Sequence, residues 1–370
     1  MSGDQRLAVA LRERSYEIVV GSGLLERAGP ALAAVLRRPE VIIVTDAHLA
    51  ATPHLAVLER SLNVAGIGRR RVVVPPGEAT KSMAQLMQLL DCLLDLGVDR
   101  ASTIVAFGGG VIGDLAGFAA AVLLRGLDYV QVPTTLLAQV DSAIGGKTGI
   151  NTRHGKNLVG AFPQPRLVLA DTAVLASLPQ RELRAGYAEV VKYGLIDRPD
   201  FFAWLEGHGR EVLAGNPAAQ QHAVLESCRA KAAVVAADER EGGVRALLNL
   251  GHTFAHALEA ACGYGHELLH GEAVALGLML AFDLSVRLGV CPAADAARVR
   301  AHFAAVGLPT TLGSVRPGGF ATDTLLAAMG HDKKAQAGRP RFVLTRGIGR
   351  AFAGAEVAPA ELEALLRAAG

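Results

Sequence analysis

Short β-branched runs alternate with longer amphipathic segments from Val41 to about residue 171, and this alternation is the strongest constraint on the fold. The β-rich runs read VIIVTD, RRVVVPPGE, STIVAFGGG, YVQVPTTLL and RLVLAD. Between them, helices are predicted near residues 47–65, after Ser82 and from about Val111. Strands that alternate with helices form a parallel sheet covered on both faces. The opening LAVALRERSYEIVVG predicts an extra strand or hairpin at the sheet edge.

After about Leu178 the β-rich runs disappear and helical spacing takes over. Segments such as RELRAGYAEVVKYG and EAVALGLMLAFDLSVRLG read as helices, and a late RPRFVLTRGIGRAF predicts a small strand pair. A chain of 370 residues has room for two domains, which we place at residues 1–178 (α/β) and 179–370 (helical). Ligands of open α/β sheets bind outside the carboxyl ends of the strands, so we expect a cleft facing the helical domain.

Composition excludes several classes of function. The chain is 51% hydrophobic, and 37 basic residues nearly balance 35 acidic ones, which argues against disorder and against nucleic acid as a partner. No apolar run reaches the length of a signal segment or a membrane span, so we expect a cytoplasmic protein without a membrane partner. The four cysteines form no CxxC pair and are expected in the core.

Lysine is scarce, with seven lysines against thirty arginines. A lysine is a compact point charge that suits a phosphate or hydroxyl group. The alternative is that the positions of the seven lysines are random and share no role, but all of them fall in or beside the candidate site segments described below. They are Lys81, Lys147, Lys156, Lys192, Lys231, Lys333 and Lys334.

Two segments of the first half suggest a bound anion. GGGVIGD at residues 108–114 follows a strand and has the GxGxxG spacing of a pyrophosphate site at a helix N-terminus. The alternative is an ordinary tight turn with the same glycine spacing. Asp46 closes an earlier strand, where it would accept ribose hydroxyls or merely cap a turn. The glycine-punctuated region 141–157 suits a hydroxylated anion, or it is a flexible surface loop.

The second half concentrates candidate metal ligands. Four of the eleven histidines fall within nineteen positions: His252, His256, His266 and His270. If one helix begins as early as Arg245, then Arg245, Asn249 and two of these histidines share one stripe. His252 and His270 would bind a metal with a carboxylate from elsewhere, or they are structural histidines. Glu189 and Lys192, three residues apart, read as a simple ion pair or as a carboxylate ligand beside a substrate-binding lysine.

In their order, these segments resemble the 3-dehydroquinate synthase family over about residues 40–350. The matching motifs are PGEATKS, GGGVIGDLAGF, RG, VPTTLLAQVDSAIGGKTGIN, GKNLVGAFPQP, AGYAEVVKYG, RALLNLGHTFAHALE, HGEAVALG and HDKK. The resemblance implies an N-terminal Rossmann-like parallel-sheet domain that binds NAD and a C-terminal helical domain that binds a divalent metal, zinc or cobalt. It implies the metal ligands Glu189, His252 and His270.

The resemblance also implies the other site residues. Positions that match the NAD site are Asp46, Glu78, Lys81, Gly109, Gly110, Asp114, Thr134, Thr135, Lys147, Lys156 and Ser177, the last standing where the family commonly has threonine. Positions that match substrate contacts are Asp141, Lys147, Lys156, Asn157, Lys192, Lys231, Arg245, Asn249, His256 and one of Lys333 and Lys334. Arg125 matches an arginine that reaches a neighbouring subunit's substrate phosphate, which implies a homodimer.

The implied reaction converts 3-deoxy-D-arabino-heptulosonate 7-phosphate into 3-dehydroquinate and phosphate. Other sugar-phosphate cyclases, such as an amino-dehydroquinate synthase, are rivals within the family. A metal-dependent polyol dehydrogenase of the same architecture is a second class, and it has less need of the lysine cluster. A non-catalytic dinucleotide-binding protein is a third class, and it gives no reason for three types of metal ligand.

Overall fold

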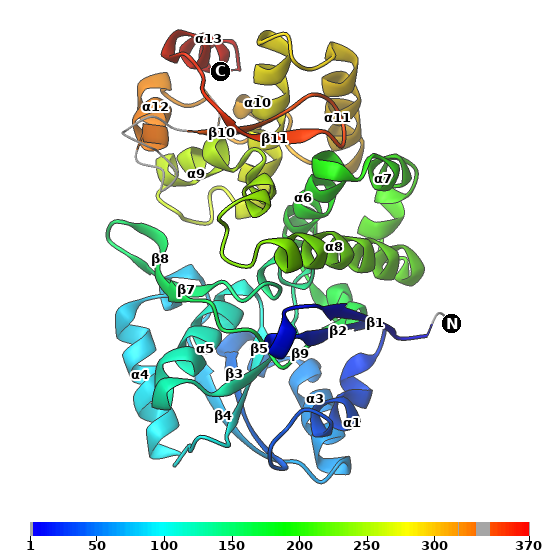
Figure 1. Ribbon diagram of the computed structural model, residues 1–370, viewed down its shortest axis with the longest axis vertical. Coiled ribbons are helices and arrows are strands. Elements are labelled where there is room, and N and C mark those ends of the chain that lie inside the picture. Colours follow the sequence, from blue (N-terminus) through cyan, green and yellow to red (C-terminus); the bar gives the residue numbers. More distant parts are fainter. Residues whose placement is uncertain (1–2, 317, 331–340, 370) are drawn as a thin grey trace. The chain divides into compact units, whose positions relative to one another are not determined.

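The computed structural model describes residues 3–316, 318–330 and 341–369 (Figure 1). The chain forms two compact units. Unit 1 comprises Met1–Leu178 and Pro217–Arg240, and unit 2 comprises Pro179–Asn216 and Glu241–Gly370.

Unit 1 is built on a seven-stranded sheet of order β1-β2-β9-β6-β5-β3-β4. β1 and β2 pair antiparallel, and every other neighbouring pair is parallel. The predicted parallel sheet and its edge hairpin are therefore confirmed. The strands are β1 (Gln5–Val9), β2 (Tyr16–Gly21), β3 (Glu40–Asp46), β4 (Gly68–Val74), β5 (Thr103–Gly108), β6 (Asp128–Pro133) and β9 (Leu167–Asp171).

Helices cover both faces of this sheet, as Figure 1 shows for α4 on one side and α1 and α3 on the other. Successive residues of a strand point to opposite faces. In β3, Val41 and Ile43 pack with α1 and α3, whereas Ile42 and Val44 pack with α4 and α5. The helices are α1 (Ala28–Ala33), α2 (Ala47–Ala50), α3 (Pro53–Val64), α4 (Met83–Asp95) and α5 (Gly110–Val122). The single helix predicted at residues 47–65 is two helices, because Pro53 begins a new one.

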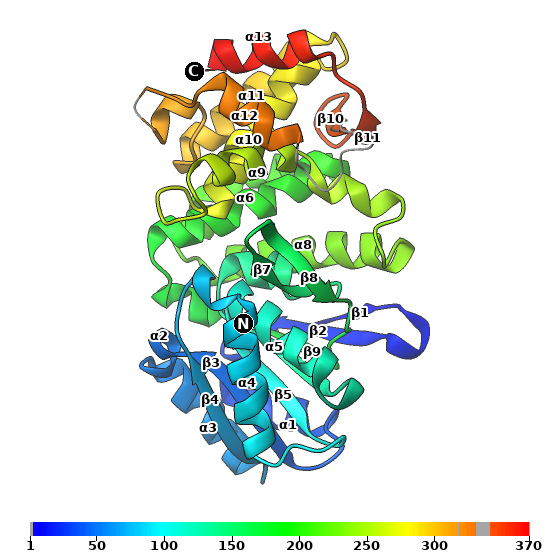
Figure 2. The same ribbon diagram turned by 90° about the vertical axis from the view of Figure 1, so that its left-hand side faces the viewer.

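The glycine-punctuated region after β6 is more ordered than a loop. A π-helix, η5 (Ala138–Ser142), precedes an antiparallel hairpin of β7 (Thr148–Thr152) and β8 (Gly155–Ala161), which is visible in Figure 2. Ile150 of this hairpin is fully buried in the core that contains α4 and α5. One apolar anchor therefore holds the glycine-rich segment against unit 1.

Helix α8 (Pro217–Ala237) belongs to unit 1, although our division at residue 178 placed it in the helical domain. It packs against β1, β2 and η5. Buried residues occur on all sides of α8, and the Cys228 thiol donates to the Gln139 carbonyl. Because the apolar residues of α8 form no single stripe, its sequence does not indicate which unit it joins.

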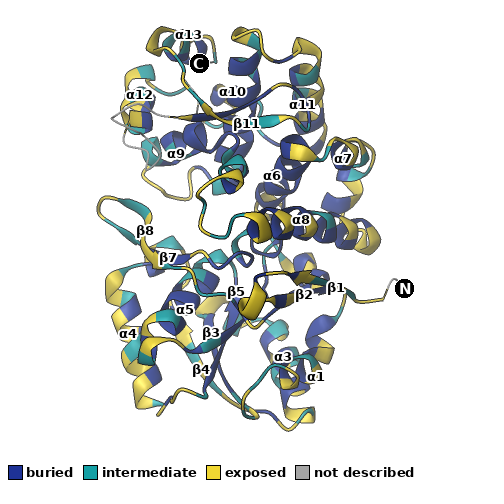
Figure 3. Cartoon of the chain, viewed as in Figure 1, coloured by how far each residue is buried: buried dark blue, intermediate teal, exposed yellow. Residues whose placement is uncertain are grey.

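Unit 2 is helical, with one small strand pair, as predicted. The long helix α10 packs against α6, α9, α11, α13 and β10, and Figure 3 shows it as mostly buried. The α-helices of unit 2 are α6 (Gln180–Asp197), α7 (Pro199–Leu213), α9 (His252–Ala261), α10 (His270–Arg287), α11 (Ala293–Val306), α12 (Thr322–Gly330) and α13 (Pro359–Ala369). Its antiparallel strands are β10 (Phe342–Thr345) and β11 (Ala351–Ala355). Within the described residues, no helix combines the length and apolar character that a membrane span requires.

Candidate functional site

Glu189, His252 and His270 meet in unit 2 as a compact cluster of ligand atoms. Glu189 lies on α6, and the two histidines are the first residues of α9 and α10. The Nε2 atoms of His252 and His270 lie 3.4 and 3.5 Å from Glu189 Oε1, and the three ligand atoms lie within 4.8 Å of one another. Two atoms bound about 2.1 Å from one tetrahedral ion lie about 3.4 Å apart. The three side chains therefore fit a divalent metal.

Two glycines allow α6, α9 and α10 to approach closely enough to form this cluster. Gly271 is the second residue of α10, and a Cβ on it would lie 2.6 Å from Ala185 Cα in α6. Gly251 precedes α9 with a φ of 77°, and a Cβ there would lie 2.6 Å from the Leu278 nitrogen of α10. Any larger residue at either position would push α10 away from its neighbour.

The stripe that we considered from Arg245 to His256 does not form, because it requires one continuous helix. Arg245 and Asn249 lie in a separate 3-10 helix, η7 (Val244–Asn249), and α9 begins only at His252. Gly251, which has a left-handed backbone conformation, separates η7 from α9 and directly precedes α9.

Each of the two histidines in the cluster has a hydrogen-bond acceptor opposite its second ring nitrogen. His252 Nδ1 lies 3.2 Å from the Leu250 carbonyl oxygen, and His270 Nδ1 lies 3.2 Å from Glu259 Oε2. An imidazole that donates from Nδ1 presents the Nε2 lone pair to a metal. Both rings are therefore assigned the tautomer that directs Nε2 toward Glu189.

The Glu189 carboxylate is fully buried, and its Oε1 has no hydrogen-bond donor of normal geometry within the described residues. Lys192 Nζ forms an ion pair with Oε2 at 2.6 Å. Burial by itself raises the pKa of Glu189, but the charge of Lys192 and the two imidazoles hold this pKa well below its usual value. A buried, ionised carboxylate oxygen that faces two imidazole nitrogens is a donor set for zinc or a similar ion.

The two histidines titrate differently. Burial lowers the pKa of His252 to about 4, so this imidazole is neutral at pH 7. Burial also lowers the pKa of His270, but the Glu259 and Glu189 carboxylates outweigh it and raise this pKa to about 10. The two carboxylates around His270 therefore favour a positive charge at this position, which a bound divalent ion would supply in place of the Nε2 proton.

Of the other residues expected in the helical half, His256 lies beside this cluster. The His256 ring lies 5.7 Å from the His252 ring, centroid to centroid. The Arg245 side chain is fully buried, and Asn249 Nδ2 donates to Glu241 Oε1 at 2.9 Å. His266, in contrast, is exposed and is not part of the cluster.

In unit 1, a glycine turn joins the carboxyl end of β5 to the start of α5. α5 begins at Gly110, and no side chain caps its N-terminus. A Cβ at Gly109 would lie 3.1 Å from Thr135 Cγ2, and a Cβ at Gly110 would lie 3.0 Å from Ser142 Oγ. Backbone amides at such a helix start are an anion-binding arrangement, so this turn fits the pyrophosphate of a dinucleotide.

A polar network centred on the buried Lys81 lies beside this turn and joins several of the predicted cofactor residues. Lys81 Nζ lies 2.7 Å from Asp114 Oδ2, 2.6 Å from Asn157 Oδ1 and 3.7 Å from Glu78 Oε1. Burial lowers the pKa of Lys81, but the two carboxylates outweigh this effect and raise the pKa, so the ammonium group stays charged. Asn151 Nδ2 donates to Glu78 at 2.7 Å, which links β7 to the network.

The predicted substrate residues of unit 1 differ in their burial. Lys231 on α8 forms an ion pair with Asp141. Lys147 is exposed and Lys156 is half-buried, both in or beside the β7–β8 hairpin. Lys333 and Lys334 lie outside the described residues.

Four further expected residues lie in unit 1, and three of them have structural contacts of their own. Asp46 caps α2, since its Oδ1 accepts from the Leu49 amide at 2.9 Å, which is the helix-cap alternative. Ser177 Oγ lies 2.8 Å from His54 Nε2. Arg125 is exposed and has a positive φ of 68°. Thr134 follows β6, and its amide donates to the Gly108 carbonyl at 3.0 Å.

The sequence reasoning missed Glu259 and Glu241, which contact predicted site residues. Glu259 lies seven residues after His252, which places both on one face of a helix, so the spacing was a usable signal. Glu241 lies before η7, where no helical or strand periodicity marks it.

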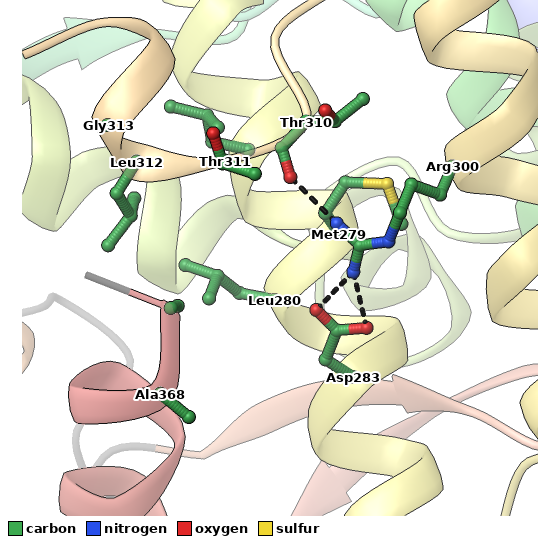
Figure 4. Close-up of a pocket in the computed structure, with 11 residues that line it drawn as sticks. Met279, Leu280, Asp283, Arg300, Thr310, Thr311, Leu312, Gly313 and Ala368 are labelled. Atoms are coloured by element: carbon green, nitrogen blue, oxygen red, sulfur yellow. Dashed lines mark hydrogen bonds and ion pairs between the residues drawn. The ribbon is translucent and has the colours of Figure 1, made fainter.

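A separate cavity of about 380 Å³ lies in unit 2 (Figure 4) and includes none of the three metal-ligand residues. Its charged side chains satisfy each other: Arg300 bonds both oxygens of Asp283, at 2.8 and 2.6 Å, and donates to the Thr310 carbonyl. The rest of the lining is mainly apolar, including Met279 and Leu280. The cavity thus offers no catalytic group, and the histidine cluster remains the candidate site.

Comparisons with known proteins give a consistent result. A family model described as 3-dehydroquinate synthase N-terminal matches residues 71–185, and one described as 3-dehydroquinate synthase C-terminal matches residues 186–335. A curated relative, 3-dehydroquinate synthase of Rhodospirillum rubrum, is 63% identical over 98% of this chain and 94% of its own length.

Two solved structures are similar along nearly their whole length. The 2-epi-5-epi-valiolone synthase of Streptomyces hygroscopicus, with NAD+ and Zn2+ bound, has a TM-score of 0.87 and 33% identity, covering 97% of this chain and 98% of its own. A 2-deoxy-scyllo-inosose synthase, complexed with carbaglucose-6-phosphate, NAD+ and Co2+, has a TM-score of 0.85 and 25% identity, covering 100% of both chains.

Proposed function

This chain belongs to the 3-dehydroquinate synthase family, and from that premise we propose that it converts 3-deoxy-D-arabino-heptulosonate 7-phosphate into 3-dehydroquinate and phosphate. The enzyme is then a phosphate-eliminating carbon–oxygen lyase of the shikimate pathway. The reaction is redox-neutral overall: C5 of the substrate is oxidised transiently, phosphate is eliminated, C5 is reduced again, and an aldol closure forms the ring.

The observation that carries this proposal is the Glu189–His252–His270 cluster. A set of three protein ligands, two imidazoles and one carboxylate, is typical of catalytic rather than structural zinc. The similar synthases that bind NAD+ with Zn2+ or Co2+ support the same two cofactors here. When bound, NAD supplies the hydride acceptor for C5, and the metal supplies a Lewis acid at the C5 oxygen.

The residues of this chain would hold the cofactors and orient a flexible, doubly anionic substrate. The glycine turn before α5 would bind the dinucleotide phosphates through its amides, and the Lys81 ammonium group pairs with Asp114 beside it. The remaining proposed cofactor contacts are Asp46, Glu78, Gly109, Gly110, Thr134, Thr135, Lys147, Lys156 and Ser177.

The proposed substrate contacts are cations and hydrogen-bonding groups suited to a phosphate and a carboxylate. Lys192 is buried beside Glu189, so it offers its charge close to the metal ligands. Holding one molecule through several successive steps is an orientation task, which explains the number of groups. The remaining members are Asp141, Lys147, Lys156, Asn157, Lys231, Arg245, Asn249, His256 and one of Lys333 and Lys334.

The proposal also includes a cytoplasmic homodimer. Arg125 would contact the substrate phosphate bound by the neighbouring subunit. Its exposure in one subunit is compatible with such a role.

Phosphate release from the heptulosonate phosphate tests the function directly. The purified protein is mixed with substrate, added zinc or cobalt, and trace NAD, while the absorbance of NADH is followed. Phosphate in large excess over NAD, without net NADH, is the expected result. NADH that accumulates with a simple polyol, without phosphate release, would show a dehydrogenase instead.

Another sugar-phosphate cyclase is the alternative that the solved relatives favour. The sequence retains Lys231, Asn249 and the lysines of HDKK, Lys333 and Lys334. Together they argue for the carboxylated substrate, because cyclases that make deoxyinosose or a valiolone alter parts of this anion-binding set. An aminated analogue of the substrate, tested in the same assay, separates an amino-dehydroquinate synthase from the proposed enzyme.

A further inference from the structure

Glu259 is a buried carboxylate that contacts a metal ligand without being a ligand itself. Its residue exposure is 2%, and its Oε2 lies 3.2 Å from Nδ1 of His270. The metal-facing atom of the same ring, Nε2, lies 3.5 Å from Glu189 Oε1. The His270 ring is therefore held between two carboxylates, one on each side.

The helices explain why this contact is possible. Glu259 and His252 lie seven residues apart on α9, which is two turns, so both side chains lie on the face that meets α10. α9 thus supplies one metal ligand directly and one acceptor for the ligand on α10. The two ligand histidines differ in this respect, because the Nδ1 acceptor of His252 is the neutral Leu250 carbonyl.

A charged acceptor at Nδ1 has two physical consequences. It fixes the tautomer and the ring orientation, so the Nε2 lone pair points at the metal position. It also makes the ring a better electron donor, because a carboxylate stabilises the imidazole N–H more than a neutral carbonyl does. Changes at such acceptors typically lower metal affinity about 10- to 100-fold.

We propose that Glu259 is a positioning residue of the metal centre, which accepts the Nδ1 hydrogen of His270 and thereby holds Nε2 for the ion. The inference rests on the proposed function only in that Glu189, His252 and His270 bind a divalent metal. The occupant is a divalent ion of borderline softness, such as zinc or cobalt, because the donor set contains two imidazoles and one carboxylate.

The test is the zinc affinity of the full-length protein, measured by competition with a chromophoric chelator. Glu259→Gln keeps the size of the side chain and removes its charge. We expect its zinc affinity to fall about 10- to 100-fold relative to the unsubstituted protein. The absorption spectrum of the cobalt-substituted protein should also change, because the donor strength of one nitrogen changes.

Asp283→Asn is the matched control. Asp283 lies on α10, as His270 does, and also pairs with a cation, but it lines the cavity of Figure 4 instead of the cluster. Its zinc affinity and cobalt spectrum should match those of the unsubstituted protein. Thermal unfolding of each metal-free variant identifies any general loss of structure, which would lower zinc binding without a role in positioning.

The outcomes separate this inference from the metal assignment. Zinc affinity of Glu259→Gln within about twofold of the unsubstituted protein, while His270→Ala no longer binds zinc, overturns the positioning role alone. An unsubstituted protein that binds no zinc or cobalt overturns the positioning role and the metal centre together. If Glu259→Gln does not fold, Glu259→Asp is measured instead: it keeps the charge but withdraws it from Nδ1, and undiminished affinity in that variant also overturns the inference.

Discussion

Replacing Gly271 by alanine should move the metal-ligand atoms apart, although all three ligand residues remain unsubstituted. The added Cβ would lie 2.6 Å from Ala185 Cα and closer still to the Ala185 carbonyl. Carbon atoms in contact normally lie about 3.5–4.0 Å apart, so α6 and the start of α10 must separate by about 1 Å or more.

This separation acts directly on two ligands. Glu189 lies one turn after Ala185 on α6, and His270 immediately precedes Gly271. The distance between Glu189 Oε1 and His270 Nε2 would increase from 3.5 Å to about 4.5 Å. Two bonds of about 2.1 Å span at most about 4.2 Å, so one ion can no longer bind both atoms.

We therefore expect Gly271→Ala to lower zinc affinity by more than about 100-fold, because changes to groups that merely support a ligand already cost 10- to 100-fold. The same overpacking should lower the free energy of unfolding by about 1–3 kcal/mol. Chelator competition and denaturant unfolding of the metal-free protein measure the two effects.

Gly207→Ala is the matched control, because the substitution is identical and also lies in a helix of unit 2. No atom lies within 4 Å of a Cβ at Gly207, and the residue is exposed on α7. Alanine should therefore stabilise the protein there by about 0.5–1 kcal/mol and leave zinc affinity unchanged. If Gly271→Ala binds zinc within threefold of the unsubstituted protein and is equally stable, the close approach of α6 and α10 does not set the cluster geometry.

Four further substitutions test the metal ligands and other parts of the molecule. Glu189→Ala and His270→Ala should each abolish metal-dependent turnover; unchanged metal content and activity would refute the ligand assignment. Burial lowers the pKa of His302 to about 4, so the folded protein favours the neutral imidazole. The contribution of His302 to the unfolding free energy is therefore complete above about pH 6.5, and it is lost, on the order of 3 kcal/mol, as the pH falls through 4. His302→Gln should flatten this part of a plot of unfolding free energy against pH. Lys81→Met should lower the unfolding free energy by about 3 kcal/mol, because it leaves Asp114 without its cation; an unchanged denaturation midpoint would contradict the buried pair.

The sequence predicted the layers of unit 1 because the burial of each strand has a strong local signature. β3 reads EVIIVTD and is buried on both faces, as a central parallel strand must be. The gathering of His252 and His270 was also predictable in kind, since few reasons other than a metal or a hydrogen-bond network gather histidines on an apolar segment. Their partner Glu189 was identified because it interrupts an otherwise apolar helix.

The remaining features depend on contacts that no local pattern encodes. The assignment of α8 to unit 1 depends on its packing against β1, β2 and η5, whereas its own sequence only shows that it is buried. The break before α9 depends on the approach of Gly251 to Leu278, far along the chain. A glycine in a sequence indicates where the backbone is free to approach another segment, but not which segment approaches it.

The charges around the cluster explain why it contains a second carboxylate, Glu259, in addition to the proposed metal ligand Glu189. His252 and His270 begin two helices, and the positive ends of helix dipoles disfavour a bound cation. Glu189 and Glu259 oppose this effect, and Lys192 neutralises one of them. With neutral imidazoles, the two carboxylates and one ammonium leave one net negative charge, so a divalent ion makes the centre positive by one. Such a centre would attract an anionic substrate, and without Glu259 its net charge would be positive by two.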